Sequence, residues 1–192
     1  MFSFRMRTAV AALIAAGSLT SLATVQAGAA PEAAPKATCN QNMELRQLVD
    51  CVLFQTTMDQ FLNYAGGKSF EDKGLIWKTN LCTGVPSDGS YYNFSNACRR
   101  HDFGYWNYPT RLRDQSESTR KRVDDRFLAD MKDSCTTSNN KPKCLDRAER
   151  YYSGVRQLGS LFFKPVRNPR EINAANSPTA RTLQEAYRQG RL

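Results

Sequence analysis

Six cysteines, all between positions 39 and 144, most strongly restrict how this chain of 192 residues can fold. An even number of cysteines in an exported protein is typical of disulfide bonds, although spacing alone leaves the pairing open. We expect the three local pairs, each closing a short loop: Cys39–Cys51, Cys82–Cys98 and Cys135–Cys144. Zinc binding is the alternative, but the sequence has no CxxC pair and its single histidine is not spaced as a ligand.

The N-terminus has the organisation of a secretion signal. Two arginines precede an apolar stretch of small residues, and residues 25–27 (Val-Gln-Ala) form an acceptable cleavage site. Glycine and hydroxyl residues interrupt the stretch, which makes it too weak for a stable membrane span. We therefore expect residues 1–27 to be a signal peptide and the protein to be secreted, which places the cysteines in an oxidising compartment.

Composition divides the rest of the chain into three parts. Residues 28–38 are rich in Ala and Pro and predict a spacer or pro-segment that cannot build a core. Residues 39–163 are long enough for one compact domain. Residues 164–192 contain six basic and two acidic residues and three prolines, which predicts a basic, largely disordered tail with room for a short helix. A solvated terminus without a role is equally compatible with this composition.

The net charge of the chain favours anionic partners. The whole sequence carries +9, and removing residues 1–27, with two arginines and no acidic residue, leaves 25 basic minus 18 acidic residues, or +7. Such a balance favours membrane surfaces, nucleic acid or acidic polymers, although solubility alone also explains it. The basic residues are scattered and no nucleic-acid-binding module is present, so we expect no nucleic-acid partner.

Apolar spacing predicts an all-α fold, because almost no stretch alternates with a period of two. We expect helices over residues 43–63, 97–108, 118–134 and 145–158, with an irregular loop over 68–92. Ser95 or Asn96 can cap the second helix, and Pro109 is expected to end it. The predicted architecture is a small disulfide-stapled helical domain with two central antiparallel helices.

The run over residues 97–105 (ACRRHDFGY) concentrates the chemistry of this chain. His101 is the single histidine, and imidazole is the side chain that exchanges protons near neutral pH. Asp102 follows directly and offers an oxygen ligand for a hard cation such as Ca²⁺. Adjacent residues on an α-helix point about 100° apart, so these two side chains should face different neighbours.

A histidine that acts as a base needs a carboxylate on its other ring nitrogen to fix its tautomer and orientation. Asp102 is badly placed for that role because it is adjacent on the same helix. Asp124 shares the predicted buried face of its helix with Met131, whereas Asp125 turns towards solvent. We choose Asp124 as the orienting carboxylate; an ordinary ion pair with a nearby arginine is the alternative.

Three segments resemble one family: residues 77–83 (WKTNLCT), 97–108 (ACRRHDFGYWNY) and 122–124 (RVD). They are similar to the small secreted phospholipases A2 of bacteria and fungi, and the resemblance covers roughly residues 43–158. It implies a monomeric secreted hydrolase that cleaves the sn-2 ester of glycerophospholipids in membranes or micelles. The sequence has no GxSxG nucleophile motif, which favours direct attack by water.

The resemblance also implies a role for each matching residue. His101 matches the base that activates water, and Asp124 matches the carboxylate that holds it. Asp102, the backbone carbonyl of Leu81 and the side chain of Asn80 match the calcium ligands. The family pattern has an aspartate at the position of Asn80, so we expect weaker calcium affinity here. A non-catalytic or weakly active protein that binds anionic membranes on the same scaffold is the alternative.

Overall fold

The structure is a computed structural model that describes residues 38–166 and positions 181, 185 and 189. The predicted signal peptide (1–27), all but one residue of the predicted spacer and most of the predicted tail lie outside the described residues. No helix among the described residues is long and apolar enough to cross a membrane.

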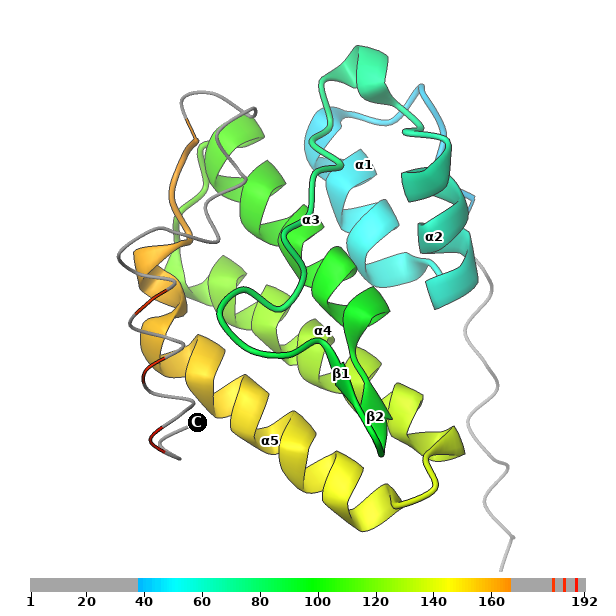
Figure 1. Cartoon of the computed structure of the whole chain (residues 1–192). Helices are drawn as coiled ribbons and strands as arrows, with labels where there is room; N and C mark the ends of the chain where they lie inside the picture. The colour runs from blue at the N-terminus through cyan, green and yellow to red at the C-terminus, as the bar shows by residue number, and fades with distance from the viewer. Residues whose placement is uncertain (1–37, 167–180, 182–184, 186–188, 190–192) are drawn as a thin grey trace, which may run out of the picture. The chain divides into compact units, whose positions relative to one another are not determined.

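Three long helices form the centre of the domain: α3 (Ser95–Arg111), α4 (Glu117–Ser134) and α5 (Lys141–Leu158) (Figure 1). The helices α3 and α4 are antiparallel. An early residue of α3, Arg100, pairs with the late Asp130 of α4, and the later Gly104 lies against the earlier Val123. The predictions of an all-α fold and of two central antiparallel helices are therefore confirmed.

The single helix predicted over residues 43–63 is wrong, because the structure divides this segment. It contains α1 (Leu45–Asp50), a π-helical turn (Cys51–Gln55) and α2 (Met58–Gly66). The break lies at Thr56, whose backbone is extended, and at Thr57, which begins α2 through a capping box with Gln60. This reciprocal cap satisfies backbone N–H groups that a continuous helix would otherwise bond, so a new helix starts there.

The predicted ends of the second helix are also wrong. The helix α3 begins at Ser95, its N-cap is Phe94 without a side-chain cap, and Pro109 lies inside it. A proline near a C-terminus removes one N–H, and here the last turn still closes because the Leu112 N–H donates to the Asn107 carbonyl over 3.2 Å. The helix therefore ends at Arg111.

The remaining helices begin earlier than predicted. Ser116 caps α4, which begins at Glu117, one residue before the predicted start, and Asn140 caps α5, whose first turn contains a proline. The loop predicted over residues 68–92 contains a short 3-10 turn (Glu71–Lys73) and the first strand of a small hairpin, β1 (Asp88–Gly89), whose partner strand is β2 (Tyr92–Asn93). Further 3-10 turns follow α4 (Cys135–Thr137) and α5 (Gly159–Leu161).

All three predicted disulfides are confirmed, so every cysteine is paired and the zinc alternative is excluded. Cys39–Cys51 joins the N-terminal segment to the π-helical turn, and Cys135–Cys144 joins the end of α4 to the start of α5. Cys82–Cys98 ties the loop before the hairpin to the first turns of α3. That loop and helix carry the residues of the candidate site.

Candidate active site

His101 and Asp124 form a buried hydrogen-bonded pair between α3 and α4. The His101 Nε2 atom lies 2.8 Å from the Asp124 Oδ1 atom, and the two side chains are 10% and 0% exposed. Because Nε2 is taken by the carboxylate, Nδ1 is the nitrogen left to accept a proton from the adjoining pocket, which His101 lines. The structure therefore contains the predicted contact between His101 and Asp124.

Two aromatic rings fix the plane of the imidazole. The ring of Tyr105 lies 4.1 Å from it and the ring of Phe127 lies 4.5 Å from it, between centroids. Tyr105 comes four residues after His101 and so lies on the same face of α3, while Phe127 comes from α4. The imidazole can hardly rotate between these rings, which keeps Nε2 directed at Asp124.

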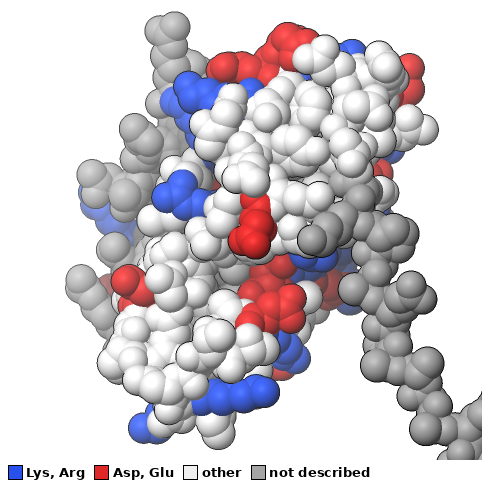
Figure 2. Space-filling model, turned by 90° about the vertical axis from the view of Figure 1, so that its right-hand side faces the viewer, with Lys and Arg blue, Asp and Glu red and all other residues white. Residues whose placement is uncertain are grey.

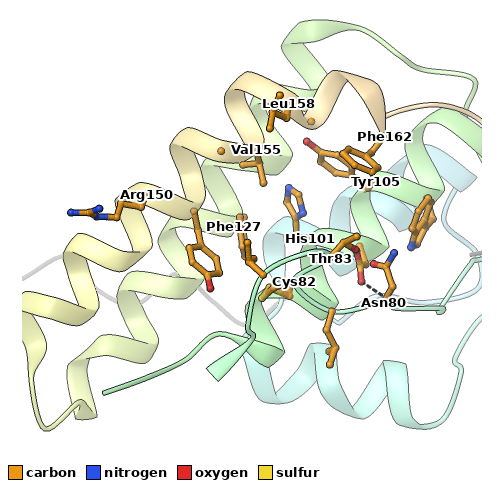
Figure 3. Close-up of a pocket in the computed structure, with 18 residues that line it drawn as sticks. Asn80, Cys82, Thr83, His101, Tyr105, Phe127, Arg150, Val155, Leu158 and Phe162 are labelled. Carbon is orange, nitrogen blue, oxygen red and sulfur yellow. Dashed lines mark hydrogen bonds between the residues drawn. A yellow bond between two sulfur atoms is a disulfide. The ribbon is translucent and has the colours of Figure 1, made fainter. Parts of the chain in front are cut away.

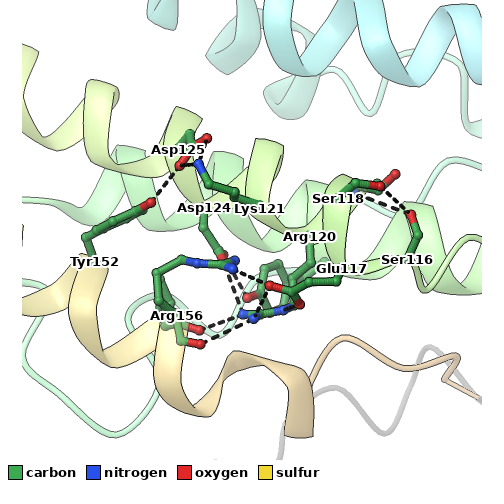
Figure 4. Close-up of polar contacts among 12 residues, drawn as sticks. Ser116, Glu117, Ser118, Arg120, Lys121, Asp124, Asp125, Tyr152 and Arg156 are labelled. Carbon is green, nitrogen blue, oxygen red and sulfur yellow. Dashed lines mark hydrogen bonds and ion pairs between the residues drawn. The ribbon is translucent and has the colours of Figure 1, made fainter.

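Asp124 accepts four hydrogen bonds from side chains. Its Oδ1 atom accepts hydrogen bonds from His101 Nε2 and from the Tyr105 hydroxyl, each at 2.8 Å. Its Oδ2 atom accepts from Arg120 Nη1 at 3.0 Å and from Arg156 Nη1 at 2.6 Å (Figure 4). Burial, and then the charge of Asp124, raise the pKa of Tyr105 above its usual range, so this hydroxyl stays a donor. These four hydrogen bonds hold both oxygens of the Asp124 carboxylate in place.

Sequence reasoning missed part of this arrangement. Arg120 precedes Asp124 by four residues on one helix, a spacing at which opposite charges meet, and this signal was available. Arg156 comes from α5, and nothing in the sequence links it to Asp124. The proposed ion pair with arginine and the pairing with histidine are both present. Asp125 is exposed and bonds Lys121 and Tyr152, as its outward position predicted.

Asp102 faces the loop on the other side of α3. Its Oδ2 accepts the Thr79 hydroxyl at 2.6 Å and the Asn80 backbone N–H at 2.9 Å. Burial raises the pKa of Asp102 to about 7, although these hydrogen bonds act in the opposite direction. The charged form therefore needs further compensation, which a cation beside the carboxylate would provide.

The adjoining loop presents more oxygen atoms. Asn80 Oδ1 is buried and has no hydrogen-bond partner among the described residues. Leu81 has a φ of 58°, in the left-handed region that non-glycine residues seldom adopt, and its carbonyl accepts a hydrogen bond from the Thr83 backbone N–H at 2.8 Å. Strain of this kind concentrates at functional sites.

These residues fit a hard cation. The set of one carboxylate, one unpartnered amide oxygen and one backbone carbonyl is the oxygen-only chemistry that Ca²⁺ prefers. The described residues contain no group of three or more His, Cys, Asp and Glu side chains that could hold a metal ion. In the set described here only Asp102 is of these types, and the other two ligand atoms are an amide oxygen and a backbone carbonyl oxygen. The disulfide Cys82–Cys98 holds this loop against α3, with 5.3 Å between its Cα atoms.

A pocket with about 770 Å³ of empty space, partly open to solvent, adjoins both His101 and Asp102. Figure 3 shows His101 between α5, which supplies Val155 and Leu158, and the loop that carries Asn80 and Thr83. All three residues predicted as metal ligands, and His101, line this pocket, whereas Asp124 lies behind the imidazole. The wall beyond the polar residues is mostly apolar.

Comparison with known proteins agrees with this geometry. A family model described as prokaryotic phospholipase A2 matches residues 49–159, which is more than half of the chain. The chain belongs to the prokaryotic phospholipase A2 family. The family consists of hydrolases, so the predicted enzyme class is confirmed at the level of the family.

Two fungal relatives of this phospholipase A2 family member are named secretory phospholipase A2. The protein of Beauveria bassiana (strain ARSEF 2860) is 35% identical over 129 residues, which is 67% of this chain and 66% of the relative. The protein of Arthroderma benhamiae (strain ATCC MYA-4681 / CBS 112371) is 31% identical over 147 residues, 73% of this chain and 95% of the relative. The chain thus spans just under two thirds of the first relative and nearly all of the second.

Proposed function

We propose that this protein is a secreted, calcium-dependent phospholipase A2 that hydrolyses the sn-2 ester of glycerophospholipids. The observation that carries the proposal is the buried His101–Asp124 hydrogen bond of 2.8 Å at the edge of an apolar pocket. Family membership, the names of the fungal relatives and the three disulfides support a secreted lipid hydrolase.

His101 acts as the general base in this mechanism. Its Nδ1 takes a proton from a water molecule while the water oxygen attacks the ester carbonyl, and the ring later returns the proton to the leaving alkoxide. Asp124 holds the other nitrogen, so the neutral ring carries its proton on Nε2 and the protonated ring is stabilised by a buried carboxylate. A base placed in this way typically contributes about 10²–10⁴-fold to the rate.

Asp102, the Asn80 amide oxygen and the Leu81 carbonyl would hold the calcium ion. When bound, Ca²⁺ supplies a Lewis acid that polarises an ester carbonyl and stabilises developing negative charge. Asn80 contributes a neutral oxygen where the family pattern has a carboxylate, so this site has one negative charge fewer. The affinity for calcium is therefore lower than it would be with aspartate at position 80.

The pocket suits an acyl chain. Val155, Leu158 and Phe162 extend its apolar wall from the polar end near His101. Phospholipid in a membrane or micelle is therefore the partner, and the protein acts as a monomer because one chain supplies the whole site. On the face of the domain in Figure 2, Lys and Arg are interspersed with Asp and Glu, so this face has no continuous basic patch of the kind that binds nucleic acid.

The test is hydrolysis of liposomes whose phospholipid is labelled at the sn-2 acyl chain. We expect calcium-dependent release of label that a chelator abolishes and that His101→Gln lowers by roughly 10²–10⁴-fold. Asp125→Asn is the matched control, because Asp125 is the exposed neighbour of Asp124 and contacts Lys121 and Tyr152 instead. This control should keep wild-type activity.

The alternative function makes a different prediction. A non-catalytic protein would bind anionic vesicles without releasing label, and release would not depend on His101. Asn80→Asp separates a weakened enzyme from a binding protein, because the added carboxylate should raise calcium affinity and hydrolysis at low calcium only in an enzyme. Label release that survives in His101→Gln would refute the proposed mechanism.

A further inference from the structure

Arg120 is a buried guanidinium whose five N–H groups all have acceptors. Its Nε and Nη2 donate to the two carboxylate oxygens of Glu117 at 2.8 and 3.0 Å. Its Nη1 donates to Asp124 Oδ2 at 3.0 Å and to the Val155 carbonyl at 2.8 Å, and its Nη2 also donates to the Arg156 carbonyl at 3.2 Å. Five donors in a planar fork are the full capacity of this side chain.

These acceptors belong to two different parts of the site. Asp124 orients the imidazole, whereas the carbonyls of Val155 and Arg156 lie in the last turn of α5, which forms a wall of the pocket. The Val155 carbonyl also accepts the backbone N–H of Gly159, so Arg120 is a second donor to it. The last carbonyls of a helix carry partial negative charge, which makes a guanidinium a favourable partner there. Arg120 therefore joins the catalytic carboxylate to the pocket wall (Figure 4).

Close packing holds Arg120 at the junction between Asp124 and the C-terminal end of α5. Gly159 follows α5 immediately, and a Cβ added there would lie 2.9 Å from Arg120 Nη1 and 2.3 Å from the Tyr105 hydroxyl. Glycine thus allows the end of α5 to approach Arg120 and Tyr105, two of the four donors to Asp124. The side chain of Arg120 is 6% exposed, so water does not compete strongly for its hydrogen bonds.

We propose that Arg120 is a positioning residue for the reaction, which holds Asp124, and through it the Nε2–H tautomer of His101, at a fixed place relative to the pocket. The inference rests on the proposed function but concerns a residue to which that function assigns no role. Arg120 does not touch the reacting atoms; it acts through Asp124.

Lysine cannot replace Arg120 in this role. An ammonium group has three donors that radiate from one atom, whereas the five acceptors around Arg120 lie around a planar fork. Arg120→Lys therefore keeps the positive charge beside Asp124 but loses at least two of the five hydrogen bonds. A requirement for charge alone predicts wild-type behaviour in this variant, and a requirement for position predicts a defect.

The single histidine permits a direct measurement. Nuclear magnetic resonance of the ¹⁵N-labelled protein reports the ring tautomer and the solvent exchange of the Nε2 proton without overlap from a second histidine. In Arg120→Lys we expect ring nitrogen shifts that indicate mixed tautomers, and exchange of this proton at least ~10-fold faster. We also expect kcat to fall about 10–100-fold, as when outer partners of a catalytic group are removed, with KM within about twofold.

Two further variants make the result decisive. Lys132→Gln is the matched control, because it cuts another α4–α5 ion pair, to Glu149, that is exposed and remote from Asp124; its ring signals and kcat should stay those of the wild type. If Arg120→Lys does not fold, Glu117→Gln tests the same junction, since Glu117 is 63% exposed and clamps the outer side of Arg120. Smaller changes in the same direction are expected there.

Wild-type tautomer and exchange rate in a folded Arg120→Lys protein would overturn the inference. If that variant does not fold, an unchanged Glu117→Gln protein overturns it equally. The ring signals do not require turnover, so a wild-type protein that fails to hydrolyse phospholipid refutes the proposed function while the positioning role is still decided by resonance.

Discussion

Gly104 sets the distance between the two helices that carry His101 and Asp124, the proposed base and its orienting carboxylate. It lies in α3, three residues after His101, and faces Val123 of α4, which directly precedes Asp124. A Cβ added at position 104 would lie 2.5 Å from Val123 Cγ1 and 3.2 Å from Leu53 Cδ2. Carbon atoms in ordinary contact are about 3.5–4.0 Å apart, so Gly104→Ala must separate the helices by about 1 Å.

The cost to stability is small in comparison with the cost to catalysis. Overpacking of this kind costs about 1–3 kcal/mol, and replacing glycine by alanine inside a helix offsets about 1 kcal/mol of it. The net loss in unfolding free energy is therefore about 0–2 kcal/mol. The same shift lengthens the His101–Asp124 contact of 2.8 Å, and a misplacement of about 1 Å can lower a rate by roughly 10²-fold.

The assay combines urea unfolding with liposome hydrolysis. We expect Gly104→Ala to unfold cooperatively with stability close to the wild type but with kcat lowered by roughly 10²-fold. Val123→Ala removes both methyl groups that meet the new Cβ, so the double variant should regain most of the lost kcat. Wild-type kcat in Gly104→Ala, or no recovery in the double variant, would refute the argument that this contact sets the catalytic distance.

Two further predictions concern stability. Hydrogen bonds, chiefly from Ser116, outweigh burial and lower the pKa of Asp114 from 3.8 to about 2. Its stabilisation is therefore complete above about pH 4 and is lost as the pH falls through 2, so thermal unfolding of Asp114→Asn should occur below the wild-type temperature at pH 7 and at the same temperature near pH 2. Replacing Cys82 and Cys98 by serine should lower the unfolding free energy by about 3 kcal/mol and, by calorimetric titration, weaken calcium binding more than replacing Cys135 and Cys144 does.

The sequence predicted the elements of this fold better than their ends. Apolar spacing located the helices because each buries one continuous face, and local disulfides were predictable because each closes a short loop. The division near Thr57 was not predicted, since apolar residues keep their spacing across the break while a capping box starts a new helix. The helix end predicted at Pro109 is wrong because one missing N–H donor near a helix end is tolerated, so α3 continues past the proline.

In the candidate site, too, some residues could be predicted from the sequence and some contacts could not. His101, Asp102 and Asp124 were found because residue type and helical phase restrict the choice to a few side chains. The contact of Arg156 with Asp124 was not predicted, because Arg156 lies 32 residues further along the chain, on another helix. Contacts between distant helices depend on packing angles that apolar periodicity does not determine.

His101 and Asp102 are adjacent on α3 but contact different neighbours, so the fold must fix two neighbouring segments relative to this helix. His101 is directed at α4, where Asp124 accepts from it, while Asp102 is directed at the loop of Thr79 and Asn80. In the proposed mechanism, His101 as base and Asp102 as cation ligand can act on the same ester only if both neighbours keep their place against one helix. Packing of Gly104 fixes α4 on one side, and the Cys82–Cys98 bridge fixes the loop on the other. Loosening either one should therefore lower the rate through a different partner: through the orientation of His101 in the first case, and through calcium affinity in the second.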